Sequence, residues 1–169
     1  MQVEAEDMVP ENEENTMNDF RFLSGKRTIR HQRLKERMVG SDEWITFDTK
    51  YEAWDMLDGA ASIDRVIGEV DGRPFEGVSV RTYDEESDTW TIYWMDIWNS
   101  NLIEQVRGQF ESGIGTFYGT EVYRGVTYRI RFLWKDITDT SARWEQAYQD
   151  PKTGDWETNW IMDFYESDE

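Results

Sequence analysis

The sequence predicts an all-β fold, a closed antiparallel up-and-down β-barrel of about ten strands that begins with a short helical plug. Turn-forming residues punctuate the chain at intervals of about ten residues. The segments between them alternate apolar and polar side chains, and helical periodicity is almost absent. Because ten short strands in an open sheet would expose long edges, closure is favoured over the alternative, a β-sandwich.

The composition indicates one domain and excludes several partner classes. The 169 residues suffice for one core but not for two ordinary domains. The 36 acidic and 18 basic side chains give a net charge of -18, which repels phosphate backbones and anionic lipids, so neither nucleic acid nor membrane is expected as a partner. The chain has no cysteine, which excludes disulfides and thiolate sites.

The first part of the chain is predicted to be an acidic disordered tail. Residues 1–19 contain seven acids and no base, too little apolar surface to offset the entropy of ordering. We therefore expect a tail over 1–17 and a single barrel domain over 18–169. With no signal peptide and no apolar stretch of roughly 18 residues, a cytoplasmic location is expected.

The order of elements follows from turn signals. The run from Asn18 to Gly25 combines a capping side chain, three large apolar residues and a terminating glycine, which predicts a helical turn that plugs one barrel end. Asp71-Gly72 is the strongest hairpin signal, and the gaps at 55–62 and 98–104 are expected to be mouth loops or lids. Strands are predicted at 26–37, 43–54, 63–70, 75–83, 89–97, 105–111, 115–123, 126–135, 142–149 and 156–165.

Alternation predicts which side chains share a face. In the eighth predicted strand the apolar face is formed by Val126, Tyr128, Ile130, Phe132 and Trp134. In the last strand the corresponding face is formed by Trp156, Thr158, Trp160, Met162 and Phe164. The segment 90–97 is apolar on both faces, so a dimer partner or the plug should cover its second face, and we expect a homodimer.

Four segments carry a family resemblance: Asp19 to Gly25 (DFRFLSG), Arg33 to Arg37 (RLKER), Ser141 to Ala147 (SARWEQA) and Trp156 to Trp160 (WETNW). The chain resembles, over about residues 19 to 165, an uncharacterised bacterial family with a calycin-like (lipocalin-type) barrel. The resemblance implies an up-and-down barrel with a central cavity and no established reaction. Such chains usually carry tryptophan two residues after the first-strand glycine. Arg27 stands there, so Phe20 or Phe22 is expected to replace that aromatic plug.

The expected function is binding of a small apolar or amphipathic molecule in an aromatic-lined cavity. Nine tryptophans and eight tyrosines supply flat amphipathic rings, although a filled core would use them equally well. A structural or interaction protein with a filled interior is therefore one alternative. The expected ligand-binding residues are Tyr93, Trp94, Tyr128, Phe132, Trp134, Trp144, Trp160, His31 and Arg131.

No cofactor or metal is expected. His31 is the only histidine. It is interpreted as a hydrogen-bonded strand residue, because haem-binding barrels of the nitrobindin type hold haem through a histidine on the C-terminal side of the barrel, where this chain has none. Only an oxygen-rich site for a hard cation is chemically available. The acidic clusters at 4–7 and 84–88 lack the glycine pattern of a calcium loop and are interpreted as solvated charge.

The second alternative is a cofactor-independent isomerase, cyclase or hydrolase that uses a buried acid with Tyr93, His31 or an arginine. The strand acids near large aromatic residues are Asp96, Glu145 and Asp163. Arg129 and Arg131 either line the interior, where they would bind a carboxylate or phosphate, or face water and pair with acids such as Glu145 or Glu157. The solvent-facing interpretation is preferred, since the aromatic row is the natural filling of a barrel.

Overall fold

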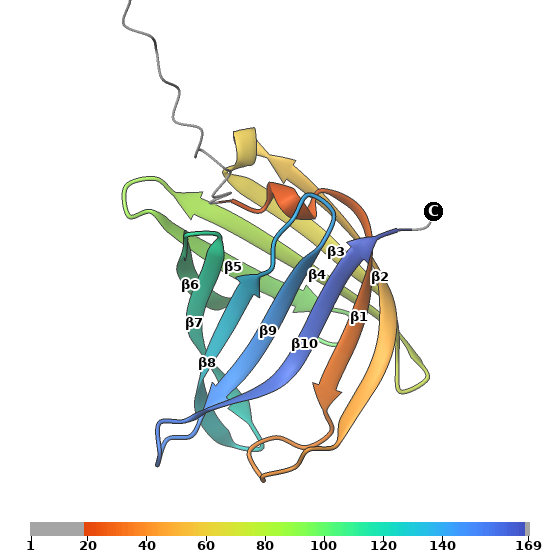
Figure 1. The fold of residues 1–169 in the computed structure, drawn as a ribbon, viewed down its shortest axis with the longest axis vertical. Coiled ribbons are helices and arrows are strands. Elements are labelled where there is room, and N and C mark those ends of the chain that lie inside the picture. The colour runs from red at the N-terminus through yellow and green to blue at the C-terminus, as the bar shows by residue number, and fades with distance from the viewer. Residues whose placement is uncertain (1–18, 168–169) are drawn as a thin grey trace, which may run out of the picture.

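The computed structural model describes residues 19–167 and shows a closed antiparallel barrel of ten strands (Figure 1). Every strand pairs with its neighbours in sequence, and β1 pairs with β10 to close the sheet. The predicted fold class is therefore confirmed, and each strand begins and ends within three residues of its predicted range. The elements are η1 (Arg21–Leu23), β1 (Gly25–Leu34), β2 (Trp44–Met56), η2 (Leu57–Gly59), β3 (Ala61–Val70), β4 (Arg73–Asp84), β5 (Thr89–Asp96), β6 (Ile103–Glu111), β7 (Ile114–Tyr123), β8 (Val126–Lys135), β9 (Ala142–Gln149) and β10 (Trp156–Glu166).

Tight hairpin turns set the strand register. At Asp71-Gly72 the φ angles are 52° and 74°, so both central residues adopt the left-handed conformation that the right-handed twist of a two-residue hairpin requires. Ser112-Gly113 and Arg124-Gly125 repeat this pattern. The predicted Asp71-Gly72 hairpin is confirmed.

The η1 turn plugs one end of the barrel, here called the plug end (Figure 1). Phe20, Phe22 and Leu23 are almost fully buried there. The Phe20 ring lies 4.9 Å from that of Trp90 and 5.9 Å from that of Trp134, both on inward faces. Phe20 and Phe22 thus occupy the closed end, as expected from the arginine at position 27.

The plug does not cover the outer face of β5. Because Trp90, which contacts Phe20, points inward, the plug covers the inner face of this strand. The suggestion that the plug shields the second apolar face of segment 90–97 is therefore wrong. The outward Tyr93 and Met95 are half-buried, and Ile97 beyond them is exposed.

A β-bulge corrects the predicted face of β10. The register against β9 shifts between Thr158 and Trp160, so one residue of β10, Asn159, has no partner across the ladder. Trp160, Met162 and Phe164, which follow the bulge, keep the predicted inward face. Trp156 lies before the bulge and is on the outer wall, against Arg131. Alternation extrapolated across the bulge had placed Trp156 and Thr158 inside, which is wrong.

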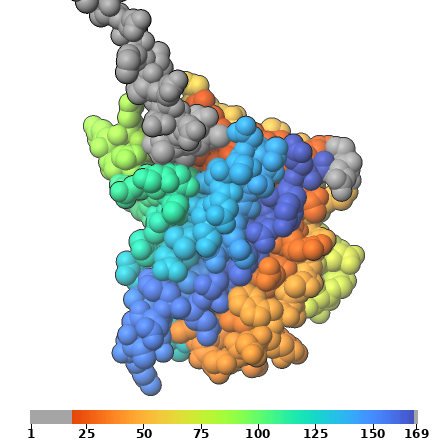
Figure 2. Space-filling model, viewed as in Figure 1, coloured from red at the N-terminus to blue at the C-terminus, as the bar shows by residue number. Residues whose placement is uncertain are grey.

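The end opposite the plug, here called the far end, is formed by other connections. Figure 2 shows the β1–β2 connection (orange) and the β9–β10 connection (blue) together at this end. Met38 N donates a 2.8 Å hydrogen bond to Glu157 Oε1, which ties the first connection to the start of β10. The mouth loop or lid predicted at 55–62 is a shorter connection, because β2 extends to Met56 and β3 begins at Ala61; it lies at the plug end, where Arg21 donates to the Asp58 carbonyl. No helix within residues 19–167 has the length and apolarity needed to cross a membrane.

Candidate ligand-binding site

Aromatic side chains fill the plug half of the barrel interior. Around Phe20 and Phe22, rings from β5, β6, β7 and β8 meet edge-on or tilted at centroid distances of 4.9 to 6.3 Å. Three of the expected ligand-binding residues, Phe132, Trp134 and Trp144, are at most 5% exposed and belong to this packed core. A ligand could reach these rings only by displacing the side chains packed against them.

A buried ion pair also lies in the plug half, and the sequence analysis did not find it. Asp64 Oδ2 accepts hydrogen bonds from Arg81 Nη2 at 2.6 Å and from the Tyr51 hydroxyl at 2.7 Å. The backbone N–H of Ser79 donates to Asp64 Oδ1 at 2.9 Å. Burial, and then the negative charge of Asp64, raises the pKa of Tyr51 well above its usual value. Both carboxylate oxygens of Asp64 accept hydrogen bonds, although Arg81 Nε is buried without one, and the mutual contacts make this network structural rather than reactive.

His31 points into the interior and is held in one tautomer. Trp160 Nε1 donates to His31 Nδ1 at 3.1 Å, and His31 Nε2 lies 2.7 Å from Thr49 Oγ1. An indole N–H can only donate, so Nδ1 carries no proton and the proton of the neutral ring is on Nε2. Burial lowers the pKa of His31 to about 4. The interpretation as a hydrogen-bonded strand histidine is supported by these contacts.

At the far end, two arginines lie over aromatic rings. Arg33 on β1 is half-buried, and its guanidinium lies 4.6 Å from the ring centroid of Trp160. Arg37, from the β1–β2 connection, is 6% exposed and lies 5.1 Å from the ring of Tyr148 and 5.6 Å from that of Tyr123. We call these five residues the far-end cluster.

Hydrogen bonds fix Arg37 in the far-end cluster. Arg37 Nη1 donates to the Tyr148 hydroxyl at 2.5 Å, and that hydroxyl donates to Glu121 Oε2. Burial, and then the charge of Glu121, raises the pKa of Tyr148, so the phenol keeps its proton. For Arg33, burial and then the charge of Arg37 lower the guanidinium pKa. The two cations are close enough to repel each other.

Further half-buried rings face the interior of the far half. Phe47 stacks on His31 with centroids 4.3 Å apart, and Tyr128 stacks on Tyr148 at 5.4 Å. Trp94 covers Gly77, where an added Cβ would lie 2.1 Å from the indole, so only glycine permits this placement. The expected residues Trp94, Tyr128, Trp160 and His31 therefore share the far half of the interior.

The other two expected residues, Tyr93 and Arg131, lie on the outer wall. Tyr93 stands between inward Ile92 and Trp94, and the Arg131 guanidinium lies 4.7 Å from the outward ring of Trp156. Neither can line the interior. The structure thus agrees with the solvent-facing interpretation of Arg131.

The partners expected for Arg129 and Arg131 were wrong. Glu145 pairs with Lys135 at 2.5 Å, and Glu157 accepts the Met38 N–H. Both arginines instead lie over outer-wall aromatic rings, with Arg129 at 4.4 Å from that of Tyr118. Flat guanidinium groups stack well on such rings and cover their apolar faces.

The three candidate acids all have local structural partners. Asp96 accepts hydrogen bonds from Trp94 Nε1 and from the backbone N–H groups of Trp98 and Asn99. Glu145 and Asp163 form outer-wall ion pairs with Lys135 and Arg143. Two carboxylates that the sequence analysis did not consider also reach the interior: Asp64 in the plug half and Glu121 at the far end. Asp64 alternates with Ser62 and Val66 along β3, and this pattern could have indicated that its side chain faces inward. A charged residue in such a row was not interpreted as inward from the sequence.

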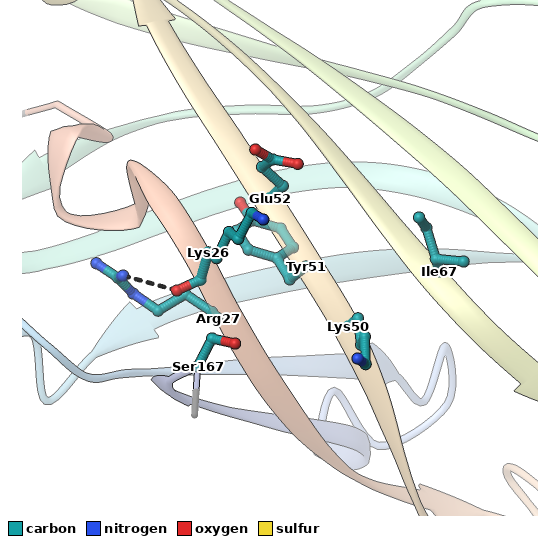
Figure 3. Close-up of a pocket in the computed structure, with 7 residues that line it drawn as sticks. All are labelled: Lys26, Arg27, Lys50, Tyr51, Glu52, Ile67 and Ser167. Carbon is teal, nitrogen blue, oxygen red and sulfur yellow. Dashed lines mark hydrogen bonds between the residues drawn. The ribbon is translucent and has the colours of Figure 1, made fainter. Parts of the chain in front are cut away.

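A shallow depression lies on the outer wall near the plug end (Figure 3). It is bordered by Lys26 on β1, by Lys50 and Glu52 on β2, and by Ser167 after β10. The outward Lys26, Lys50 and Glu52 side chains give it mixed charge. None of the expected ligand-binding residues contributes to it, although its lining also includes the core residue Tyr51.

Within residues 19–167, no three histidine or acidic side chains are grouped so that they could hold a metal ion.

Comparison with known proteins adds no assignment to these observations. The chain matches no protein-family model, and a search of the curated proteins likewise gives no match.

Proposed function

We propose that the protein binds a small amphipathic molecule at the far end of its barrel. The observation that carries this proposal is the difference between the two halves of the interior. The plug half is filled by buried rings, whereas the rings of Phe47, Tyr128 and Trp160 in the far half are only partly buried. Partly exposed inward rings beside fixed polar groups are typical of ligand sites.

The titratable groups in the far half favour binding over acid–base catalysis. His31 has both ring nitrogens engaged and a pKa of about 4, and Tyr148 holds its proton more tightly than a free phenol. Neither group is poised to exchange a proton near neutral pH. These two residues therefore give the enzyme alternative no support.

We also propose that the barrel is calycin-like, that the protein is cytoplasmic and that it forms a homodimer. The closed up-and-down topology and the plug ahead of β1 support a calycin-like (lipocalin-type) barrel. The absence of cysteine supports a cytoplasmic location. A homodimer is supported by apolar side chains in and beside the β5–β6 connection that are about half exposed: Ile97, Trp98, Leu102 and Ile103.

Titration with N-phenyl-1-naphthylamine, a neutral dye that fluoresces in apolar sites, tests the binding proposal. We expect saturable binding to the native protein. Trp160→Ala should weaken it about tenfold, because stacking on the inward ring is lost. Trp156→Ala is the matched control, since this tryptophan of the same strand is on the outer wall. No saturable binding, or equal effects of the two substitutions, would support a filled structural barrel instead.

A further inference from the structure

Arg33 is a half-buried cation with no direct counter-ion in the described chain. Among residues 19–167 it makes no hydrogen bond and no ion pair; it lies over the face of Trp160, and the charges of Asp71 and Glu121 act on it only through space. Two outer-wall arginines do have acid partners: Arg30 pairs with Asp48 at 3.2 Å and Arg65 with Glu76 at 3.0 Å. Arg129 and Arg131 also lie over rings without such a partner, but on the outer wall. In a chain with twice as many acids as bases, an inward arginine without a carboxylate contact is a departure that calls for a cause.

Arg37 places a second guanidinium beside the first. Its described hydrogen bond goes to a neutral phenol, and the nearest acid in that chain of contacts, Glu121, is reached only through Tyr148. The Met38–Glu157 hydrogen bond anchors the connection that carries Arg37. The cation is therefore held in place before any ligand arrives, which lowers the entropic cost of binding.

A third polar group in the interior also lacks a partner. The bulge in β10 brings Asn159 into the interior with no exposed surface. Its Oδ1 accepts a 2.9 Å hydrogen bond from Gln146 Nε2, while its Nδ2 makes no hydrogen bond in the described chain. A buried amide donor without a partner is costly, and an oxygen-bearing ligand would relieve that cost.

We infer that the far-end cluster recognises an organic anion, with a carboxylate, phosphate or sulfonate held by Arg33 and Arg37 and a flat apolar part on the ring of Trp160. This inference rests on the proposed function and names its ligand class. Guanidinium groups bind such oxyanions through paired N–H donors, and the bond is strengthened where water is partly excluded. The ring supplies the apolar contact that a free inorganic anion would not use.

Two dyes that differ by one charged group give the test. 1-Anilinonaphthalene-8-sulfonate is N-phenyl-1-naphthylamine with an added sulfonate. We expect the native protein to bind the sulfonate at least tenfold more tightly than the neutral dye, against the repulsion of a net charge of -18. Decanoate and decyl phosphate should displace the bound sulfonate, and decanol should not. Whether decanoate or decyl phosphate displaces the dye at the lower concentration distinguishes carboxylate from phosphate ligands.

Substitution of Arg33 shows whether the preference comes from this site. Arg33→Gln should lower the ratio of sulfonate affinity to neutral-dye affinity about tenfold, the effect of losing one charge-assisted hydrogen bond. Arg33→Lys keeps the charge and should recover part of the preference. Arg129→Gln is the matched control, because Arg129 also lies over an aromatic ring but on the outer wall.

The outcomes separate this inference from the proposed function. If neither dye binds saturably, the proposed function fails. If the neutral dye binds but the sulfonate is not preferred, or if Arg33→Gln and Arg129→Gln weaken sulfonate binding equally, the anion inference fails and the binding proposal stands. Circular dichroism tests whether each variant retains the native fold. If Arg33→Gln does not fold, the affinities of Arg33→Lys for the two dyes give the comparison.

Discussion

The guanidinium of Arg81 lies 4.8 Å from the ring centroid of Phe20, while its Nη2 donates a 2.6 Å hydrogen bond to Asp64. One buried cation thus joins the plug to the strand wall: Phe20 precedes η1, Asp64 lies on β3 and Arg81 on β4. Because guanidinium faces stack on rings while their edges donate hydrogen bonds, both contacts are satisfied together. The plug is therefore part of the core and not an appendage.

Phe20→Ala should lower the free energy of unfolding by about 3–5 kcal/mol, since it removes a buried ring and leaves a cavity among five other aromatic residues. Denaturant unfolding followed by tryptophan fluorescence measures this loss. Tyr165→Ala, at a half-exposed aromatic residue, should cost less than about 1 kcal/mol. Comparable losses in the two variants would contradict the role assigned to the plug.

Asp64→Asn should destabilise the fold by about 3–5 kcal/mol, because it leaves the charge of Arg81 buried without its counter-ion. The double variant Asp64→Leu with Arg81→Met should be more stable than Asp64→Asn, since it removes both charges. Asp48→Asn is the control at the exposed pair with Arg30, and should cost less than about 1 kcal/mol. Equal midpoints of urea unfolding for Asp64→Asn and Asp48→Asn would show that the buried pair stabilises the fold no more than the exposed pair does.

His31 should make the fold lose stability in mild acid. Above pH 6.5 the ring is neutral in both the folded and the unfolded chain. Between pH 6.5 and about 4 the unfolded chain binds a proton that the folded chain does not, so stability falls as the pH falls. At about 1.4 kcal/mol per pKa unit, the loss approaches about 3 kcal/mol near pH 4.

The variant His31→Gln isolates this effect of His31. Glutamine keeps a donor and an acceptor without titrating, so the difference in unfolding free energy between native and variant protein should shrink or reverse from pH 7 to pH 4. Carboxylates titrate over the same range in both proteins and cancel in the difference. A difference that is constant over this range would mean that His31 titrates normally in the folded protein.

Trp98→Asp should weaken self-association, if the exposed apolar residues beside the β5–β6 connection form a dimer interface. Trp98 is 60% exposed, so the substitution removes little intramolecular packing and adds a charge that an interface would have to bury. Sedimentation equilibrium should give twice the mass of one chain for the native protein and a single-chain mass for the variant. Val122→Asp, at a residue of β7 that is 67% exposed, is the control. A native protein that stays monomeric at high concentration would remove the dimer from the proposal.

Local patterns were sufficient to predict the strands and the plug. Turn signals such as Asp71-Gly72 act on two adjacent residues, and the alternation from Val126 to Trp134 reflects a single buried face, so neither depends on distant contacts. The plug was predictable because a short run of phenylalanines before the first strand has few other places to bury its rings. The acidic tail predicted at 1–17 lies outside the described residues.

Only the tertiary structure decided which polar residues meet inside the barrel. Asp64 and Arg81 lie 17 positions apart, and Arg37 and Tyr148 lie 111 apart, so no local pattern pairs them. The bulge at Asn159 reversed the face of Trp156, because alternation fails wherever one strand gains a residue over its neighbour. Sequence thus determined the strands, whose signals are local. Closure of the barrel determined the candidate site, because it brings side chains from distant strands into one interior.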